Sequence, residues 1–345
     1  MHRIVSFASP PAQAGVDLSS ALASALSGLP TDLKSWVHEP MAGADVNEGT
    51  PRVGDGAPAD PDADDPALTW TPPHERVLAQ ALGLRVGDGQ VPVGGLLAAR
   101  AGLPRDGRVW ARVSPVHWQL GTEQVTMRDP TDLALEEPEA RALFESVRPW
   151  FEEEDYALHW VQPSLWLAAH PGLAGLRTAS LDRVSGRNVD LWLGADPQAR
   201  RLRRLQSEVQ MLWHTHPVNV RRESEGRETV NSFWIDGCGP VPDADVLDRA
   251  LAVVVDERLR APALRGDLAA WQAVLRQVVD DVLADARAAS QRGQACRVSW
   301  CGERRAVTMS PPPGASAMGR LWGRVRQVLR PQGERRTWPA CLETL

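Results

Sequence analysis

The chain has 345 residues, of which 43% are hydrophobic, so it can bury a full core and is better matched by two structural units than by one. Its net charge of −6 gives no general attraction to nucleic acid or to anionic lipid. No stretch approaches the roughly 18 to 20 apolar residues of a membrane-spanning helix, and the N-terminus lacks a secretory signal pattern. We therefore expect a cytoplasmic protein that binds neither nucleic acid nor membrane.

The cysteine and tryptophan counts bear on redox state and burial. Four cysteines do not make a disulfide framework in a chain of this length, so we expect reduced thiols at Cys238, Cys296, Cys301 and Cys341. Fourteen tryptophans accompany a single tyrosine. Because indole rings bury large areas in cores and also anchor binding surfaces, we expect most of these tryptophans in the core.

The N-terminal part of the chain predicts a strand, a helix and a loop. Residues 4–8 form a short apolar run typical of a buried strand. Residues 17–29 repeat apolar side chains at helical spacing. Residues 44–66 are rich in Asp, Pro, Gly and Ala and have almost no apolar periodicity, so we expect a solvated loop there. A further helix should begin near Pro73.

The middle of the chain predicts short strands and two amphipathic helices. The first helix is expected over residues 136–148, where Pro149 should end or kink it. The second begins at Asp196-Pro197, and its arginines near the start are solvated, paired with acidic neighbours, or placed to meet an anion. Strands are expected at residues 109–113, 124–127, 157–161 and 164–168, the last two forming a hairpin.

The C-terminal part returns to alternating strands and helices. Residues 251–255 predict a buried strand, and a long helix capped by Asp267 should bury Trp271 on its apolar face. Two strands are expected at residues 296–300 and 306–309. We therefore predict an α/β fold, in which residues 1–105 and 241–345 form a sheet-centred core and residues 106–240 form an inserted α+β domain.

The densest polar stretch lies between residues 180 and 239 and contains two clusters. Arginine forks, histidine, asparagine amides and main-chain N–H groups next to glycine are donors that recognise phosphate or carboxylate. An arginine that serves such a site should be replaceable without loss of stability. The alternative is structural, with arginines in ion pairs and asparagines capping turns. The predicted site for a small phosphorylated or carboxylate ligand consists of Arg183, Arg187, Asn188, His216, Asn219, Arg222 and Asn231.

Metal and phosphate-loop chemistry find little support in the sequence. His214 and His216 lie at alternate positions and could bind a metal with Cys238 or Asp236, but a metal site needs three or four converging ligands. The glycine pair at residues 94 and 95 is too short to predict a phosphate loop. We predict neither a metal site nor a cofactor.

Several runs of sequence resemble one known family, the proteobacterial regulatory protein family RpfE. They are residues 179–189 (Ala-Ser-Leu-Asp-Arg-Val-Ser-Gly-Arg-Asn-Val), 204–212 and 230–234, together with residues 71–76, 115–118 and 301–304. The likeness covers nearly the whole chain. It implies a regulatory protein and leaves the activity open, because the family is named after a pathogenicity-regulation gene cluster.

A more distant resemblance carries more chemistry. The pattern His216-Pro217-Val218-Asn219, followed by Arg222, Gly226, Asn231 and Gly237-x-Gly239, is similar to a segment of the archaeal-type, cofactor-independent phosphoglycerate mutases. Those enzymes share the alkaline phosphatase fold, carry an inserted α+β domain and use two metal ions. The resemblance implies an alkaline-phosphatase-like core, here reduced.

The chain departs from that family where its metal ligands should be. The first strand runs into Ala8-Ser9-Pro10 instead of Asp-Gly, residues 262–267 replace an Asp-Glu-Ala-Gly-His type motif, and Cys301-Gly302-Glu303 replaces an Asp-His pair. Two-metal phosphoryl transfer needs several carboxylates and histidines around the ions. Our leading hypothesis is therefore a catalytically degenerate relative of these mutases that acts as a regulatory or ligand-binding protein.

The alternative hypothesis is an active phosphoglycerate mutase or phosphatase with relocated metal ligands. It would have to recruit Asp129, Asp182, His216, Asp236 and Glu303.

Overall fold

The computed structural model describes residues 1–9, 37–40, 69–122, 124–194 and 196–310. The chain forms two compact units, the first made by Met1–Ala67, Pro73–Gly83 and Arg249–Leu345, the second by Leu68–Pro72 and Leu84–Asp248. The second unit includes residues 84–105, which the sequence analysis assigned to the core. The predictions for residues 17–29, residues 44–66 and Cys341 lie outside the described residues. Among the described helices, none is long and apolar enough to span a bilayer.

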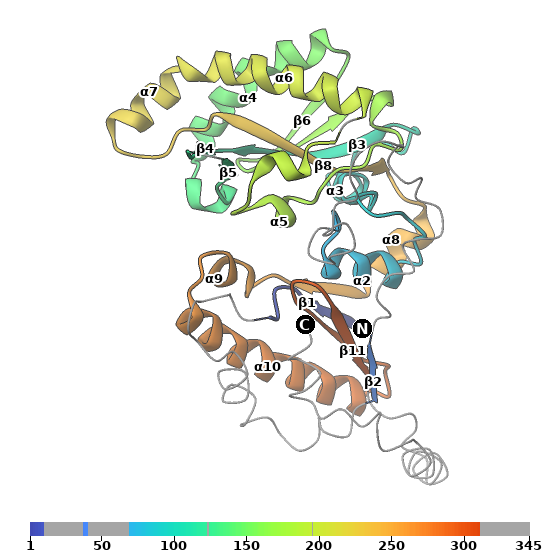
Figure 1. Ribbon diagram of the computed structural model, residues 1–345. Helices are drawn as coiled ribbons and strands as arrows, with labels where there is room; N and C mark the ends of the chain where they lie inside the picture. Colours follow the sequence, from blue (N-terminus) through green and yellow to red (C-terminus); the bar gives the residue numbers. More distant parts are fainter. Residues whose placement is uncertain (10–36, 41–68, 123, 195, 311–345) are drawn as a thin grey trace, which may run out of the picture. The chain divides into compact units, whose positions relative to one another are not determined.

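The first unit is built on a five-stranded sheet (Figure 1). The three adjacent strands β10, β1 and β9 run parallel, and β11 and β2 continue the sheet in antiparallel fashion. This mixed sheet with its helices confirms the predicted α/β class. In spatial order, the strands are β2 (Val37–Pro40), β11 (Ala306–Ser310), β10 (Arg297–Cys301), β1 (His2–Val5) and β9 (Val253–Asp256).

Helices cover both faces of this sheet because side chains alternate along each strand. Val5 and Trp300 pack against α10 (Leu268–Gln291) on one face. Ile4 and Cys301 pack against α2 (Pro73–Ala81) on the other. Strand β9 is only partly buried, so the sequence overestimated its burial. The short helix α9 (Arg260–Leu264) precedes α10, and α8 (Ala244–Leu251) precedes β9.

A hydrogen-bonded chain of side chains crosses the α2 face of this sheet and makes stability depend on pH. His2 Nε2 lies 2.8 Å from Ser299 Oγ, which lies 2.6 Å from Thr308 Oγ1. Burial and the charge of Arg297 lower the pKa of His2 from 6.5 to about 4. Between these two values the unfolded chain binds a proton that the folded chain excludes, so the free energy of unfolding should fall as pH drops from 6.5 toward 4.

Urea unfolding at a series of pH values checks this expectation. In the His2→Gln variant, the decline within that window should be smaller than in the parent protein. An identical decline in both proteins would mean that His2 titrates normally in the folded state.

The second unit contains a four-stranded antiparallel sheet. The predicted hairpin of the sequence is confirmed as β6 and β7. The outer strand β8 was not predicted as a strand, because its Asp-Gly-Cys-Gly stretch was interpreted as part of a polar loop. In spatial order, the strands are β6 (Ala157–Gln162), β7 (Leu165–Ala169), β3 (Val109–Val116) and β8 (Ser232–Pro240).

Two long helices cover one face of this sheet, and a shorter helix covers part of the other (Figure 1). The long helices are α4 (Glu137–Glu153) and α6 (Pro197–His214), and the shorter one is α3 (Val93–Arg100). Helix α4 continues through Pro149, which was expected to end or kink it. Phe151, two residues further on, is fully buried, so burial of this last turn offsets the hydrogen bond that proline cannot make.

The glycine pair at the start of α3 is explained by close packing against the sheet. A Cβ atom at Gly94 would lie 2.6 Å from the Cα of Ala111, and one at Gly95 would collide with the carbonyl of Pro240. The two glycines therefore let a helix approach the main chain of β3 and β8.

Short elements connect the sheet and helices of the second unit. A two-stranded hairpin is formed by β4 and β5, paired through Trp118 and Met127. Three short helical elements, η4, α5 and η5, lie between β7 and α6 along the chain. The remaining elements are β4 (Trp118–Leu120), β5 (Val125–Met127), η3 (Pro130–Leu133), η4 (Pro171–Leu173), α5 (Leu181–Val184), η5 (Val189–Trp192) and α7 (Pro217–Ser224).

Candidate ligand-binding pocket

The first predicted polar cluster forms a compact turn structure around α5. Arg183 is almost fully buried, and its Nη2 donates to Thr69 Oγ1 at 3.2 Å. Arg187 Nη1 donates to the carbonyl of Arg183 at 3.2 Å. Asn188 accepts a hydrogen bond from the N–H of Asp190 and so caps η5. These contacts stabilise the turn.

The second predicted cluster surrounds α7, where side chains cap and tie the main chain. His216 is the N-cap of α7 and accepts from the N–H of Val218 at 3.2 Å, and burial lowers its pKa. The Asn219 amide donates to the carbonyls of Trp213 and Val230 and accepts from the Val230 N–H at 2.9 Å. Asn219 is buried, so these three bonds satisfy groups that water does not reach.

The two clusters contact the same small hairpin from two sides. Asn231 accepts from the N–H of Trp118 at 2.7 Å and donates to its carbonyl at 2.9 Å, which fixes β4. The Arg187 carbonyl accepts from the N–H of Met127, and Asn188 bridges to Thr126, which fixes β5. The structure thus joins both clusters to the β4–β5 hairpin.

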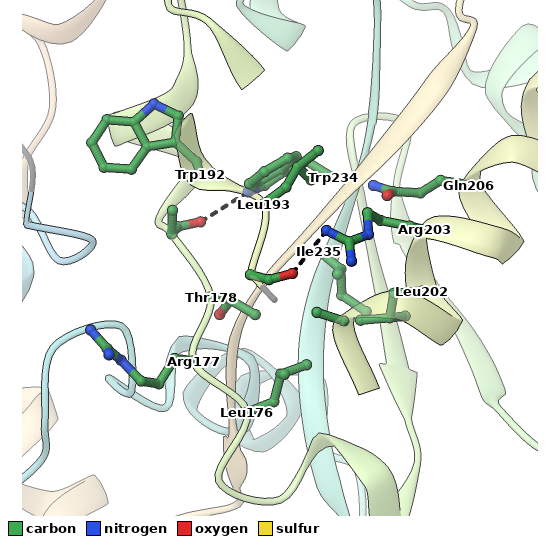
Figure 2. Close-up of a pocket in the computed structure, with 13 residues that line it drawn as sticks. Leu176, Arg177, Thr178, Trp192, Leu193, Leu202, Arg203, Gln206, Trp234 and Ile235 are labelled. Carbon is green, nitrogen blue, oxygen red and sulfur yellow. Dashed lines mark hydrogen bonds between the residues drawn. The ribbon is translucent and has the colours of Figure 1, made fainter. Parts of the chain in front are cut away.

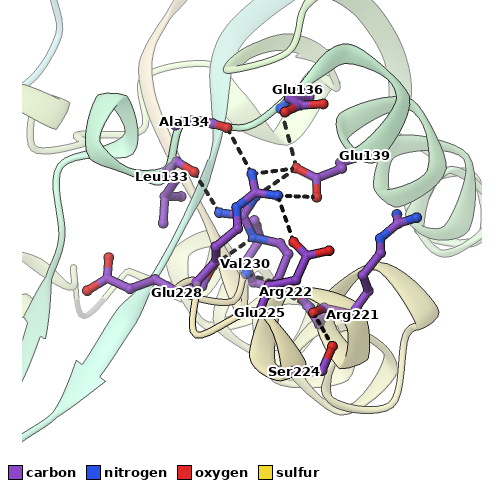
Figure 3. Close-up of polar contacts among 12 residues, drawn as sticks. Leu133, Ala134, Glu136, Glu139, Arg221, Arg222, Ser224, Glu225, Glu228 and Val230 are labelled. Atoms are coloured by element: carbon purple, nitrogen blue, oxygen red, sulfur yellow. Dashed lines mark hydrogen bonds and ion pairs between the residues drawn. The ribbon is translucent and has the colours of Figure 1, made fainter.

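Arg222 is the most completely buried of the predicted ligand-binding residues (Figure 3). Its side chain is 1% exposed, and Nη1 donates to Glu139 Oε2 at 2.7 Å. Its Nε donates to the carbonyl of Glu228 at 2.7 Å and its Nη2 to that of Leu133 at 2.6 Å. All three guanidinium nitrogens therefore have protein partners, and Arg222 is a scaffold residue with no surface to offer a dissolved anion.

Glu139 completes this network from the first turn of α4. Its carboxylate also pairs with Arg227 at 3.1 Å and accepts from the N–H of Glu136 in a capping box. Burial alone would raise the pKa of Glu139, but Arg222, the Glu136 N–H and Arg227 hold it below its ordinary value. The network therefore links α4, η3 and α7 through one ionised carboxylate.

The residues that a relocated metal site would need have other partners. Asp236 accepts hydrogen bonds from Nε and Nη2 of Arg112, at 2.7 and 2.5 Å, and from the Leu181 N–H. Asp129 caps η3. His214 is the last residue of α6 and not part of a strand. In the part of the chain that the structure describes, no group of three or more histidine, cysteine or acidic side chains has the arrangement of a metal site.

The cysteine thiols described are free and buried. Burial raises the pKa of Cys238 to about 12, with the Thr178 hydroxyl 4.0 Å from its sulfur. Burial also raises the pKa of Cys296 and Cys301. A raised pKa lowers the fraction of thiolate at neutral pH, so burial works against nucleophilic chemistry at all three thiols.

A pocket opens at the outer edge of β8 (Figure 2). The segment from Leu176 to Gly194 passes over this edge and returns to the start of α6, and the pocket lies between the segment, the helix and the strand. Its cavity volume is about 40 Å³.

The walls of the pocket are mainly apolar. Trp192 and Trp234 are only 3% and 4% exposed, so each contributes a narrow strip of surface. The helical repeat of α6 places Ala199 and Leu202 on the side that faces the strand. The apolar lining consists of Leu176, Ala179, Trp192, Leu193, Gly194, Ala199, Leu202, Trp234 and Ile235.

Polar side chains at the pocket hold its walls in place. Gln206 is 4% exposed, and its amide donates to the carbonyl of Phe233 in β8 at 2.8 Å. Thr178 accepts from the N–H of Gly237 at 3.1 Å. The indole N–H of Trp234 donates to the carbonyl of Ala179 at 2.9 Å (Figure 2). Because these bonds fix both the segment and the strand edge, the pocket is largely preformed.

Arg203 supplies the positive charge of the pocket. Its Nη1 donates to the carbonyl of Gly194 at 2.9 Å, which holds the partly buried guanidinium at the wall (Figure 2). Among the described residues, no carboxylate pairs with Arg203, whereas Arg204 pairs with Glu208 and Arg177 with Asp88. Arg200 and Arg201 are exposed. Of the four arginines at the start of α6, one therefore faces the pocket.

Sequence reasoning did not find this pocket. One available signal was Gln206, a polar residue on the apolar stripe of Leu202, Leu205 and Val209. A buried amide on such a stripe indicates a main-chain partner or a ligand. The other signal was the excess of tryptophan, which was assigned to the core.

Comparisons with known proteins find only remote likenesses. No protein-family model matches the sequence, and no curated protein sequence matches it. A cofactor-independent phosphoglycerate mutase from Thermoplasma acidophilum DSM 1728 is 14% identical, with a TM-score of 0.30 over 91% of this chain and 90% of that one. The PH0037 protein from Pyrococcus horikoshii is 11% identical, with a TM-score of 0.40 over 90% and 87%. At these values, the likenesses assign neither a family nor an activity to the chain.

Proposed function

We propose that this chain is a regulatory protein that binds a small molecule in the pocket at the edge of β8, without catalysis and without a metal. In this proposal it is a degenerate relative of the phosphoglycerate mutases, as the RpfE-like and mutase-like sequence patterns suggested. The observation that carries the proposal is the preformed apolar pocket with one arginine at its wall. A concave apolar site with a few fixed polar groups is the usual form of a ligand site.

The hydrogen bonds that the polar residues make within the protein support a binding role over an enzymatic one. Asp236, Asp129 and His216 each hold protein groups. Phosphoryl transfer with two metal ions needs converging ligands and a free nucleophile. Binding needs neither of them, and a regulatory protein can act through a change in stability or shape when its ligand binds.

Two measurements on the full chain test this proposal together. Assays of 3-phosphoglycerate conversion with added Mn²⁺ or Mg²⁺ should give no turnover. In thermal denaturation, a panel of 3-phosphoglycerate, AMP, 3-phenylpropionate and hexanoate should contain at least one compound that raises the Tm, because a ligand of the native state stabilises it by mass action.

A variant that fills the pocket tests whether the compound that raises the Tm binds there. Ala199→Phe places a ring in the pocket and should abolish the rise in Tm, whereas Ser207→Phe on the exposed side of the same helix should retain it. Metal-dependent turnover would overturn the proposal in favour of the enzyme. A panel without any stabilising compound, or an unchanged response in Ala199→Phe, would also contradict it.

A further inference from the structure

Strand β9 is an outer strand of the sheet in the first unit, and no described strand pairs with its far edge. The carbonyls of Ala252 and Asp256 accept hydrogen bonds from N–H groups of β1. Alternate residues of a strand direct their main-chain groups to the same side. Val253 and Val255 therefore direct their N–H and carbonyl groups away from the sheet, where a further strand can bond to them.

Within β9, the features that normally protect an outer strand from pairing are missing. Native proteins protect such edges with charged side chains, proline or a bulge. The sequence of β9 is Val-Val-Val-Asp, and its register with β1 is continuous. The carboxylate of Asp256 is 4% exposed and pairs with Arg3 and Arg258. Val254 is 44% exposed, and Leu251, just before the strand, is 86% exposed, so the edge is regular and apolar.

The other outer strands of the two larger sheets are protected. Strand β2, at the opposite edge of the same sheet, contains Glu39 and Pro40. The pairing of β6 with β7 is irregular between Trp160 and Gln162. Residues 176–194 pass over the edge of β8 and accept one of its N–H groups. The unprotected edge of β9 is thus an exception within this protein.

The sequence of β9 is complementary to itself. In antiparallel pairing about a twofold axis at Val254, this residue lies opposite its own copy, and Val253 lies opposite Val255 of the second copy. The outward main-chain groups of Val253 and Val255 then bond to each other, and β-branched side chains face one another. Like charges do not meet, because Asp256 lies opposite Ala252 of the second copy.

We propose that β9 pairs with β9 of a second copy of this chain, which gives a twofold dimer with one continuous sheet. The dimer uses the first unit and is independent of the pocket in the second. Because β9 has four residues, the interface is small, and the dimer dissociates on dilution.

Sedimentation equilibrium of the full chain over about 1–200 µM tests this proposal, a range that suits a small interface. The mass of the parent protein should rise from that of one chain, 37.7 kDa, toward that of two. Val254→Lys and Val254→Glu should each keep the mass of one chain, because twofold pairing places like charges directly opposite. An equimolar mixture of the two variants should recover the dimer, because opposite charges then face each other.

Val254→Thr is the matched control, because it stays β-branched and uncharged, and it should dimerise like the parent. Both charged variants should keep the circular dichroism spectrum of the parent, since Val254 is partly exposed. A parent that has the mass of one chain at every concentration would overturn the proposal and leave the edge to a strand of another protein. Dimers of Val254→Lys alone, or a mixture of folded charged variants that does not dimerise, would also overturn it.

Discussion

Replacing Arg222 with glutamine should lower the free energy of unfolding by about 3–5 kcal/mol, which is the usual cost of breaking a buried ion pair by removing one partner. The substitution leaves the Glu139 carboxylate buried with a weaker set of partners, and it removes bonds to the carbonyls of Glu228 and Leu133. Urea denaturation followed by circular dichroism measures the loss. Such a loss would contradict the sequence-based expectation that this arginine can be replaced without loss of stability.

Arg227→Gln provides the control within the same network. Arg227 contacts the same Glu139 carboxylate, but its side chain is 31% exposed and water can replace its contacts. Its loss should cost about 1 kcal/mol or less. Equal and small losses in both variants would show that Arg222 is accessible to solvent and is not a scaffold residue.

Replacing Trp271 with alanine should cost about 3–5 kcal/mol in the first unit, because a large side chain leaves a cavity that the core fills only partly. Trp271 is fully buried in the core between α10 and the sheet, and its indole N–H donates to the Phe7 carbonyl at 3.0 Å. That bond helps to hold the turn after β1, where Phe7 has the left-handed φ of 55°. The loss is measured by urea denaturation.

Trp271→Phe separates the two contributions, since it keeps most of the ring volume and removes only the hydrogen bond. Its cost should be clearly below that of Trp271→Ala. A Trp271→Ala variant as stable as the parent would show that this face of α10 does not pack on the sheet.

Helical periodicity predicted much of the fold because it reports burial directly. Asp196 with Pro197, and Asp267 before Trp271, marked the starts of α6 and α10 correctly. The outer strand β8 was not predicted, because its local sequence does not report its burial. Its Asp236, Gly237 and Gly239 have low strand propensity, and they are accommodated there by Arg112 and by the close approach of α3. Such compensation depends on tertiary contacts that local sequence does not contain.

The candidate site was harder to predict because polar residues serve structure and binding alike. Arg222 and Asn219 were selected for their donor groups, yet Glu139, 83 residues from Arg222, and main-chain carbonyls satisfy those donors. Arg203 was noted only as one of four arginines. Its role depends on which of the neighbouring arginines form ion pairs with carboxylates, as Arg204 does with Glu208. Pairing across such distances is decided by the fold.

The most direct test of the ligand-binding pocket is to observe the tryptophan indole N–H signals of nitrogen-15-labelled protein by NMR while each compound of the panel is added, beginning with the one that raises the Tm most. Trp192 and Trp234 line the pocket, and Trp271 lies in the core of the first unit. We expect the signals of Trp192 and Trp234 to shift in a saturable manner and that of Trp271 to stay in place. A saturable shift of Trp271 without Trp192 and Trp234, or no saturable shift with any compound of the panel, would contradict the assignment of the pocket as the ligand site.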